Sequence, residues 1–206
     1  MTESAHDWDQ SYERQGHAPW DIGRPQAAFV ALADAGRLRG EVLDAGCGTG
    51  EHALLVASRG GRATGVDVSQ AAIRFARQKA VDRALDATFE AGDILTMTLP
   101  GDGFDTVIDS GLFHVFDDEQ RAQYVEVLAG AVRPGGSAFV ICFSDRQPGD
   151  WGPRRVTRDE LEAAFADGWA IEQIEPALFD INPVFEIDPA GGLTTASAWL
   201  AEVRRT

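Results

Sequence analysis

Residues 42–50, VLDAGCGTG, constrain the fold more than any other part of the sequence. An apolar run typical of a buried strand leads into three glycines at alternate positions, and a helical pattern follows over residues 51–59. Glycine lets the backbone turn sharply and lets a ligand approach it without a Cβ in the way. The segment therefore predicts a strand, a tight turn that binds a ligand at Gly46 and Gly48, and a helix.

An acidic residue follows this loop at a spacing typical of nucleoside-binding folds. Asp67 lies 21 residues after Gly46, at the end of the strand predicted over residues 63–68, where it can accept hydrogen bonds from both hydroxyls of an adenosine ribose. The loop departs from the dinucleotide pattern GxGxxG, because position 51 is glutamate and an anion there is a poor neighbour for a pyrophosphate. Together with Asp44 before the loop, Glu51 favours a nucleoside that carries an ammonium and a sulfonium.

Strands and helices alternate along the remainder of the chain. Apolar runs predict strands over residues 41–45, 63–68, 87–90, 104–109, 137–143, 169–174 and 198–203. Apolar spacing and capping signals predict helices over residues 51–59, from Ser69 to about 80, over 118–132 and from Thr157 to about 168. This alternation predicts an α/β three-layer sandwich with a mainly parallel sheet, in a single domain over residues 1–206. Ligands of such sheets bind outside the carboxyl ends of the strands.

The composition argues against several classes of function. The 18 basic and 33 acidic residues give a net charge of −15, which disfavours nucleic acid and an anionic membrane surface as partners. No run approaches the roughly 20 apolar residues of a membrane span, and the first residues lack the pattern of a signal peptide, so we expect a cytoplasmic location. Cys47 and Cys142 are too few for a disulfide framework. His6, His17 and His52 lack metal-ligand spacing, so no metal is expected.

The glycine loop and the segments around it resemble the class I S-adenosylmethionine-dependent methyltransferases over about residues 8–175. VLDAGCGTG, GVDVS, EAGDI and FDTVIDSGLFHVF are similar to four ordered motifs of that family, and RPGG is similar to its usual entry to the fifth strand. The resemblance implies a Rossmann-like, seven-stranded sheet in the order 3-2-1-4-5-7-6 with the last strand antiparallel. It also implies S-adenosyl-L-methionine as cofactor and S-adenosyl-L-homocysteine as product.

The resemblance also assigns residues to the cofactor. Asp67 would hold the ribose, Asp93 would meet the adenine amino group and Ile94 would meet the adenine ring. The predicted cofactor-binding residues are Trp20, Asp44, Gly46, Gly48, Asp67, Val68, Asp93, Ile94, Asp109 and Gly111. For Asp44, a contact with the cofactor ammonium and a structural role at the helix terminus both remain open.

The amino-terminal segment resembles a narrower branch, the thiopurine, thiol and halide methyltransferases. The residues that carry this resemblance are Trp8-Asp9, Tyr12, Gly16 and PWDIGRP at 19–25. It implies that residues 1–36 form a lid over the cofactor and that Trp20 packs near the methionine moiety. An indole face there would stabilise a sulfonium by roughly 0.5–2 kcal/mol. The alternative is that Trp20 anchors this segment to the core.

Methyl transfer is an in-line displacement, so a base is needed only if the acceptor arrives protonated. His114, beyond the strand predicted over residues 104–109, is the best-placed candidate for that base. Alternatively, it shapes the pocket or caps the next helix. Arg154 could hold an anionic acceptor or be a solvated charge. The predicted acceptor-binding residues are Trp8, Tyr12, Phe113, Trp151 and Arg154.

These features predict an enzyme that methylates a hydroxyl, thiol or nitrogen of a small aromatic or heterocyclic compound, in detoxification or secondary metabolism. One alternative is a thiol or halide methyltransferase that acts on small anions. A second is a module that binds S-adenosylmethionine without catalysis. We expect a small-molecule partner, no nucleic acid or membrane partner, and a monomer or homodimer.

Overall fold

The computed structural model describes residues 5–13, 18–182 and 194–206, so Gly16 and His17 lie outside the described residues. Its helices are α1 (Ala5–Glu13), α2 (Ala27–Asp34), α3 (Glu51–Ser58), α4 (Gln70–Asp82), α5 (Asp118–Ala131) and α6 (Arg158–Ala164). Its strands are β1 (Glu41–Ala45), β2 (Arg62–Asp67), β3 (Thr88–Ala91), β4 (Phe104–Ser110), β5 (Val132–Phe143), β6 (Trp169–Asp180) and β7 (Thr195–Arg205).

The described strands form one seven-stranded sheet in the order β3-β2-β1-β4-β5-β7-β6. β1 pairs in parallel with β2 and β4, β2 pairs in parallel with β3, and β4 with β5. β7 runs antiparallel to both β5 and β6. The predicted order and the antiparallel last strand are therefore confirmed. Because the strand order reverses between β1 and β4, their carboxyl ends flank the crevice where ligands of such sheets bind.

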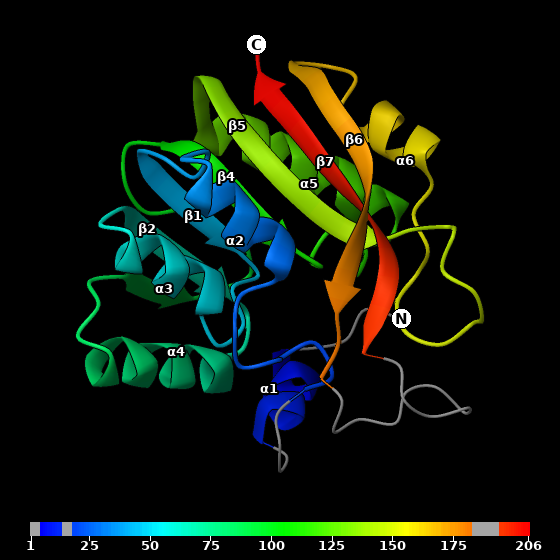
Figure 1. The fold of residues 1–206 in the computed structure, drawn as a ribbon. Coiled ribbons are helices and arrows are strands. Elements are labelled where there is room, and N and C mark those ends of the chain that lie inside the picture. The colour runs from blue at the N-terminus through cyan, green and yellow to red at the C-terminus, as the bar shows by residue number, and fades with distance from the viewer. Residues whose placement is uncertain (1–4, 14–17, 183–193) are drawn as a thin grey trace.

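Helices cover both faces of the sheet, with α2 and α3 in front of it and α5 behind it in the view of Figure 1. Consecutive strand residues point to opposite faces. Val42 joins a core cluster with Leu54 of α3, while the next residue, Leu43, joins a second cluster with Leu128 of α5. A parallel sheet that is buried in this way on both faces confirms the predicted three-layer sandwich.

Several element boundaries differ from those predicted. β5 begins at Val132, five residues earlier than expected, because the pairing between β4 and β5 shifts register and accommodates the RPGG segment. β6 and β7 are each longer than expected because they pair with each other along Trp169–Asp180 and Thr195–Arg205. The sequence reading missed α2, whose N-cap, Gln26, makes no side-chain capping hydrogen bond.

The two predicted helix starts with capping side chains are confirmed. Ser69 accepts a hydrogen bond from the Ala72 N–H at 3.1 Å, which begins α4 beside the end of β2. Thr157 and Glu160 form the reciprocal capping box of α6. The start of α4 is thereby fixed at the carboxyl edge of the sheet, next to the glycine loop.

The helix α1 lies outside the three layers, at the edge toward which β6 points (Figure 1). Tyr12 and Ala18 of this segment form a small separate cluster with Ala71 and Ala72 of α4. By contrast, α2 packs into the sandwich, where Phe29 is fully buried. Of the predicted lid range 1–36, the described residues before α2 therefore lie at the carboxyl edge, whereas α2 is part of the sandwich.

Candidate functional site

The turn after β1 is made of glycines in the left-handed region, with φ of +66° at Gly46, +52° at Gly48 and +85° at Gly50. A Cβ on Gly48 would lie 2.8 Å from the hydroxyl oxygen of Tyr12. A Cβ on Gly50 would lie 2.7 Å from the ring of Phe89. Other residues would be both strained and crowded here, so the turn requires glycine at the carboxyl end of β1.

Asp67, the last residue of β2, is tied directly to this turn. One of its carboxylate oxygens accepts a hydrogen bond from the Gly48 N–H, and the other accepts one from the Ser69 N–H, both at 2.8 Å. Burial raises the pKa of Asp67 to about 6, although these two hydrogen bonds oppose the shift. Each carboxylate oxygen has two lone pairs, so both can still accept a ligand hydroxyl.

Asp44 is fully buried beneath the same turn. Its Oδ2 accepts a hydrogen bond from the Ala53 N–H at 3.0 Å, in the first turn of α3. Its Oδ1 is enclosed and has no hydrogen-bond partner among the described residues. Burial raises the pKa of Asp44 to about 7, and the nearby charges of Asp67 and Asp109 add to this shift. The structural role at the helix terminus is therefore present, and one oxygen remains unsatisfied.

Three aromatic residues of the amino-terminal segment gather over the glycine turn. The ring centroids of Trp8 and Trp20 lie 5.3 Å apart, and those of Tyr12 and Trp20 lie 6.2 Å apart, both in edge-to-face geometry. The indole N–H of Trp20 donates a hydrogen bond to the Tyr12 hydroxyl at 2.9 Å. Trp20 is 38% exposed, so it caps the turn from outside and does not anchor the core.

This segment is attached to the sandwich at two further places. Asp9 of α1 accepts hydrogen bonds from the Ser69 hydroxyl at 2.6 Å and the Ala71 N–H at 2.9 Å, at the start of α4. The Gln26 side chain exchanges two hydrogen bonds with the backbone of Asp180 at the end of β6. The sequence did not predict these attachment roles for Asp9 and Gln26, because each contact joins segments that are far apart in the chain.

A pocket of about 50 Å³ lies between this segment and the turn. Its lining residues include Trp20 and Asp21 on one side, Gly46 and Gly48 on the other, and Ser110 at the end of β4. The pocket thus occupies the crevice between β1 and β4 that the sheet topology predicts.

The charge of Glu51 is neutralised in the structure. Its carboxylate is buried and forms ion pairs with Lys79 and Arg83 of α4, each at 2.8 Å. Burial alone would raise the pKa of Glu51, but the hydrogen bonds from Arg83 and Lys79 outweigh it and hold the pKa below its usual value. The predicted repulsion between Glu51 and a pyrophosphate is therefore weaker than its sequence position suggests.

His114 lies in the turn after β4, with its ring packed against those of Phe143 and Phe179. Its Nδ1 accepts a hydrogen bond from the Phe143 N–H at 3.0 Å. Burial lowers the pKa of His114 to about 3, and the charges of Arg121 and Arg155 lower it further. A general base needs a free lone pair directed at its substrate, and the acceptor nitrogen of this neutral ring is already occupied. The predicted base role is therefore not supported by the geometry.

Asp109 and Phe113 lie in the interior and not at the pocket, which corrects their assignment as binding residues. Asp109 is fully buried, and its oxygens accept hydrogen bonds from the N–H groups of Leu112 and Phe113 and from the Tyr124 hydroxyl. Phe113 is fully buried and stacks on Phe165. Both residues fix the turn after β4, which in turn places His114.

Arg154 lies on the surface and does not enter the pocket. It forms ion pairs with Asp118 of α5 and Glu160 of α6, so the prediction that it holds an acceptor is wrong for this conformation. Trp151 packs edge-to-face on Phe143, and the Arg155 guanidinium lies over both rings. Trp151 therefore packs next to the aromatic ring that contacts His114, and it is not among the residues that line the pocket at the glycine turn.

The predicted adenine contacts differ in exposure. Asp93 is exposed and accepts a hydrogen bond from the Leu95 N–H at 2.9 Å, whereas Ile94 is buried in the core cluster that also contains Val66. Val68 is half-buried beside Asp67. The Ile94 side chain is therefore a core residue here, and its contact with the adenine ring stays a prediction.

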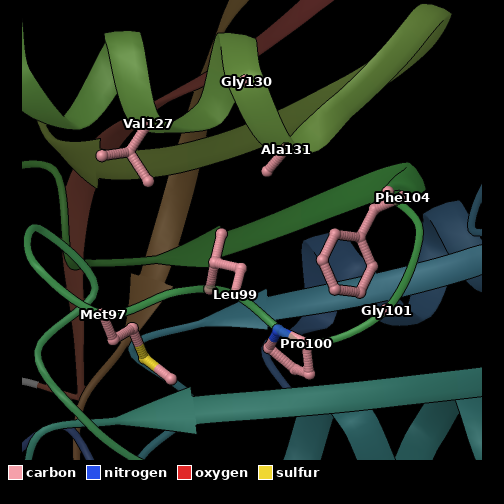
Figure 2. A pocket seen from close by; sticks show the side chains of 9 residues that line it. Met97, Leu99, Pro100, Gly101, Phe104, Val127, Gly130 and Ala131 are labelled. Carbon is pink, nitrogen blue, oxygen red and sulfur yellow. The ribbon is translucent and has the colours of Figure 1, made fainter.

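The described residues contain no cluster of His, Cys, Asp or Glu side chains that could hold a metal ion. None of the helices in these residues has the length and apolar character needed to cross a membrane. A separate pocket of about 250 Å³ lies between Leu99, Phe104 and the last turns of α5 (Figure 2). Phe104 begins β4, so that pocket lies at the opposite end of this strand from the turn that carries His114.

Comparison with known proteins identifies the family. A family model for a methyltransferase domain matches residues 42–136. The chain is 36% identical over 185 residues to the 2-heptyl-1-hydroxyquinolin-4(1H)-one methyltransferase of Mycobacteroides abscessus, covering 88% of this chain and 82% of that protein. It is 28% identical over 158 residues to the probable thiol methyltransferase 2 of Arabidopsis thaliana, covering 75% of this chain and 69% of that protein.

A solved structure described as "Conversion of a Disulfide Bond into a Thioacetal Group during Echinomycin Biosynthesis" matches with a TM-score of 0.80 and 42% identity, covering 91% of this chain and 85% of that one. The chain belongs to the S-adenosylmethionine-dependent methyltransferases. The cofactor of this methyltransferase is thus S-adenosyl-L-methionine, which becomes S-adenosyl-L-homocysteine after transfer.

The residues of the methyltransferase fit this cofactor. The buried Oδ1 of Asp44 lacks a partner among the described residues, as expected of an oxygen that a ligand or its water would satisfy. The glycine turn lines the pocket with Gly46 and Gly48, where the backbone of Gly48 packs closely against the Tyr12 hydroxyl. The Asp67 carboxylate beside it can accept two hydroxyls. These three features are independent, and all of them lie at the crevice between β1 and β4.

Proposed function

We propose that this methyltransferase methylates a small aromatic or heterocyclic acceptor at a hydroxyl, thiol or nitrogen. The observation that carries the proposal is the 36% identity, over 88% of this chain, to the relative from Mycobacteroides abscessus that is named for a hydroxyquinolone substrate. Phe143 and Phe179 beside His114 are buried, whereas Trp151 is half-buried and would be the ring against which a flat aromatic acceptor stacks.

We assign the cofactor to residues around the glycine turn. Asp67 would accept the ribose hydroxyls, the Gly46 and Gly48 backbone would lie against the nucleoside, and Asp44 Oδ1 would take the ammonium directly or through water. Trp20 would present its indole face to the sulfonium. Bound there, the cofactor supplies a methyl group on a positively charged sulfur, which is an electrophile for in-line displacement.

The chain itself contributes alignment and exclusion of water. The amino-terminal segment, tied down through Asp9 and Gln26, would act as the lid that closes the pocket. Holding donor and acceptor in line can lower the barrier by several kcal/mol. Closure also removes the hydration that stabilises an anionic nucleophile.

A second candidate is methyl transfer to small anions such as thiocyanate or a halide. It is favoured by the similarity to a thiol methyltransferase, which is 28% identical and covers 75% of the chain. The similarity to the hydroxyquinolone methyltransferase, at 36% identity over 88% of the chain, favours the larger acceptor.

The test is a product screen by mass spectrometry with purified protein, S-adenosylmethionine and a panel of acceptors: 1-hydroxyquinolin-4(1H)-one, phenol, thiophenol, thiocyanate and iodide. We expect methylated product and S-adenosylhomocysteine with the aromatic acceptors. Preferred methylation of thiocyanate or iodide would favour the second candidate. Cofactor binding in calorimetry without any product would point to a binding module and overturn the proposal.

A further inference from the structure

The two ring nitrogens of His114 have different roles. Nδ1 accepts the Phe143 N–H, so in the neutral imidazole the single proton must be on Nε2. Burial keeps the ring neutral throughout the physiological range, since the pKa of His114 falls to about 3. The charged groups that act on the ring are Arg121 of α5 and Arg155 of the loop after β5, and both oppose its protonation.

The Nε2 edge of the ring faces the carboxyl end of β4. A Cβ built on Gly111, which has a φ of +91°, would lie 3.2 Å from Nε2 and Cε1 of His114 and 3.2 Å from the ring of Phe179. The residue before it, Ser110, lines the pocket. Among the described residues, Nε2 has no hydrogen-bond partner, and it is not one of the fully enclosed polar atoms. A donor without a partner among the described residues therefore lies next to Gly111 and Phe179, one residue along the chain from the pocket-lining Ser110.

We propose that the Nε2–H of His114 is a hydrogen-bond donor that positions an acceptor which arrives already ionised. The inference rests on the proposed function and narrows its substrate class to acidic hydroxyls and thiols, which lose their proton in water before they bind. The acceptor anion then forms its bond to the methyl carbon as the carbon–sulfonium bond breaks, and both electrons of that bond pass to sulfur. No proton moves to the protein in this step.

The first test uses 4-substituted thiophenols and phenols with graded pKa values and follows kcat/KM against pH. We expect the rate to rise through the pKa of each acceptor and to remain on a plateau above it. The inflection should shift by about one pH unit for each unit of acceptor pKa. An inflection at one fixed pH for all acceptors, or a rate that falls above the acceptor pKa, would assign the proton to a base on the enzyme and overturn the inference.

Two substitutions at the same position separate the donor from the ring. His114→Phe keeps a planar ring but removes both the Nε2 donor and the Nδ1 acceptor of the Phe143 N–H, so its Tm is measured as well. It should lower kcat/KM for anionic acceptors about 10- to 100-fold, the usual value of a hydrogen bond to a charged group. His114→Gln replaces the donor with an amide N–H and should recover part of this loss. Calorimetry with S-adenosylhomocysteine should give a similar Kd for all three proteins, and equal rates for them would refute the positioning role.

The tautomer can be measured without any acceptor. In a ¹⁵N–¹H correlation spectrum of protein labelled at histidine, His114 should be the neutral Nε2–H tautomer from pH 5 to 9. His52 is the matched control, because its Nε2 accepts the Gln26 N–H, so its proton must be on Nδ1. If no acceptor in the panel reacts, the proposed function is refuted, and the tautomer of His114 is still measurable. If His114 is the Nδ1–H tautomer or is doubly protonated, this inference is refuted even when an acceptor reacts.

Discussion

Trp20 donates its indole N–H to the hydroxyl oxygen of Tyr12 across 2.9 Å, directly over the glycine turn. The bond fixes the indole plane above the pocket, although the ring itself is more than one-third exposed. An exposed ring contributes little to folding, so its fixed orientation is better explained by a contact with a ligand.

We expect Trp20→Ala to reduce turnover much more than stability. Loss of a cation–π contact of roughly 0.5–2 kcal/mol corresponds to about a 2- to 30-fold decrease in kcat/KM. The Tm without cofactor should change by only about 2 °C, and Trp20→Phe should keep part of the activity. Parallel losses of activity and Tm would identify Trp20 as a packing residue.

Asp67→Asn should weaken the binding of S-adenosylhomocysteine about 10- to 100-fold, because charge-assisted hydrogen bonds contribute roughly 1.5–3 kcal/mol. Calorimetry measures this directly. Asp82→Asn removes the same charge at the exposed end of α4, where its carboxylate only accepts a bond from Gln78. That control should bind normally, and an unchanged Kd for Asp67→Asn would contradict the ribose assignment.

The buried Asp44 makes stability depend on pH. Its pKa is near 3.9 in the unfolded chain and about 7 when folded, so the folded state holds the extra proton between these values. Stability must therefore fall as pH rises from about 4 to 7 and then level off. The buried His52 and His114 have lowered pKa values, so they make stability rise with pH up to about pH 6.5 and oppose the effect of Asp44. The contribution of Asp44 is therefore measured as the difference between the wild type and a variant that lacks its carboxyl group.

Asp44→Asn removes this titration while leaving an oxygen to accept the Ala53 N–H. Without cofactor, the variant should be more stable than the wild type at pH 8 by at least about 1 kcal/mol, or about 2–4 °C in Tm. The gain should shrink toward pH 4. Thermal melts of both proteins across this range measure it, and a gain that is independent of pH would argue against a raised pKa.

Glu51→Gln should lower the free energy of unfolding by about 1–3 kcal/mol, because it breaks buried hydrogen bonds to Lys79 and Arg83. Urea unfolding gives the value. Glu162→Gln is the matched control, since Glu162 forms an exposed pair with Arg158 and should cost less than about 0.5 kcal/mol. Similar losses in both variants would mean that burial of Glu51 contributes little.

Asp9→Ala should release α1 from the start of α4. It removes the acceptor for the Ser69 hydroxyl and the Ala71 N–H, a loss comparable to that of an N-cap, about 0.5–2 kcal/mol. We expect faster proteolysis within residues 5–26 and a weaker cofactor Kd, with an unaltered core. Glu13→Gln, on the same helix and paired only at the surface with Arg74, should have neither effect.

The repeated strand–helix pattern was enough to predict the α/β sandwich, and the spacing of the glycines was enough to predict the turn. Both depend on local signals: apolar runs form strands, Ser69 and Thr157 begin helices, and alternate glycines allow the turn. The sheet order and the antiparallel last strand were implied by the family resemblance. The α2 helix escaped prediction because it lacks a capping side chain and is stabilised by burial of Phe29.

The chemistry of the site was only partly readable in this way. The sequence displays residue types: a histidine at 114 suits a base, an aspartate at 109 suits a cofactor-binding residue, and an arginine at 154 suits the binding of an anion. It does not display their hydrogen-bond partners. Their partners are Phe143, Tyr124 and Glu160, which come from other elements of the fold.

The sequence by itself determined the architecture and the place of the nucleoside site, because backbone conformation follows from short-range patterns. Only the tertiary structure decided which nitrogen of His114 is free, that Glu51 is neutralised and that Asp44 keeps an oxygen without a partner among the described residues. Hydrogen bonding and desolvation depend on what surrounds a group in space, and those neighbours are brought together by long-range packing.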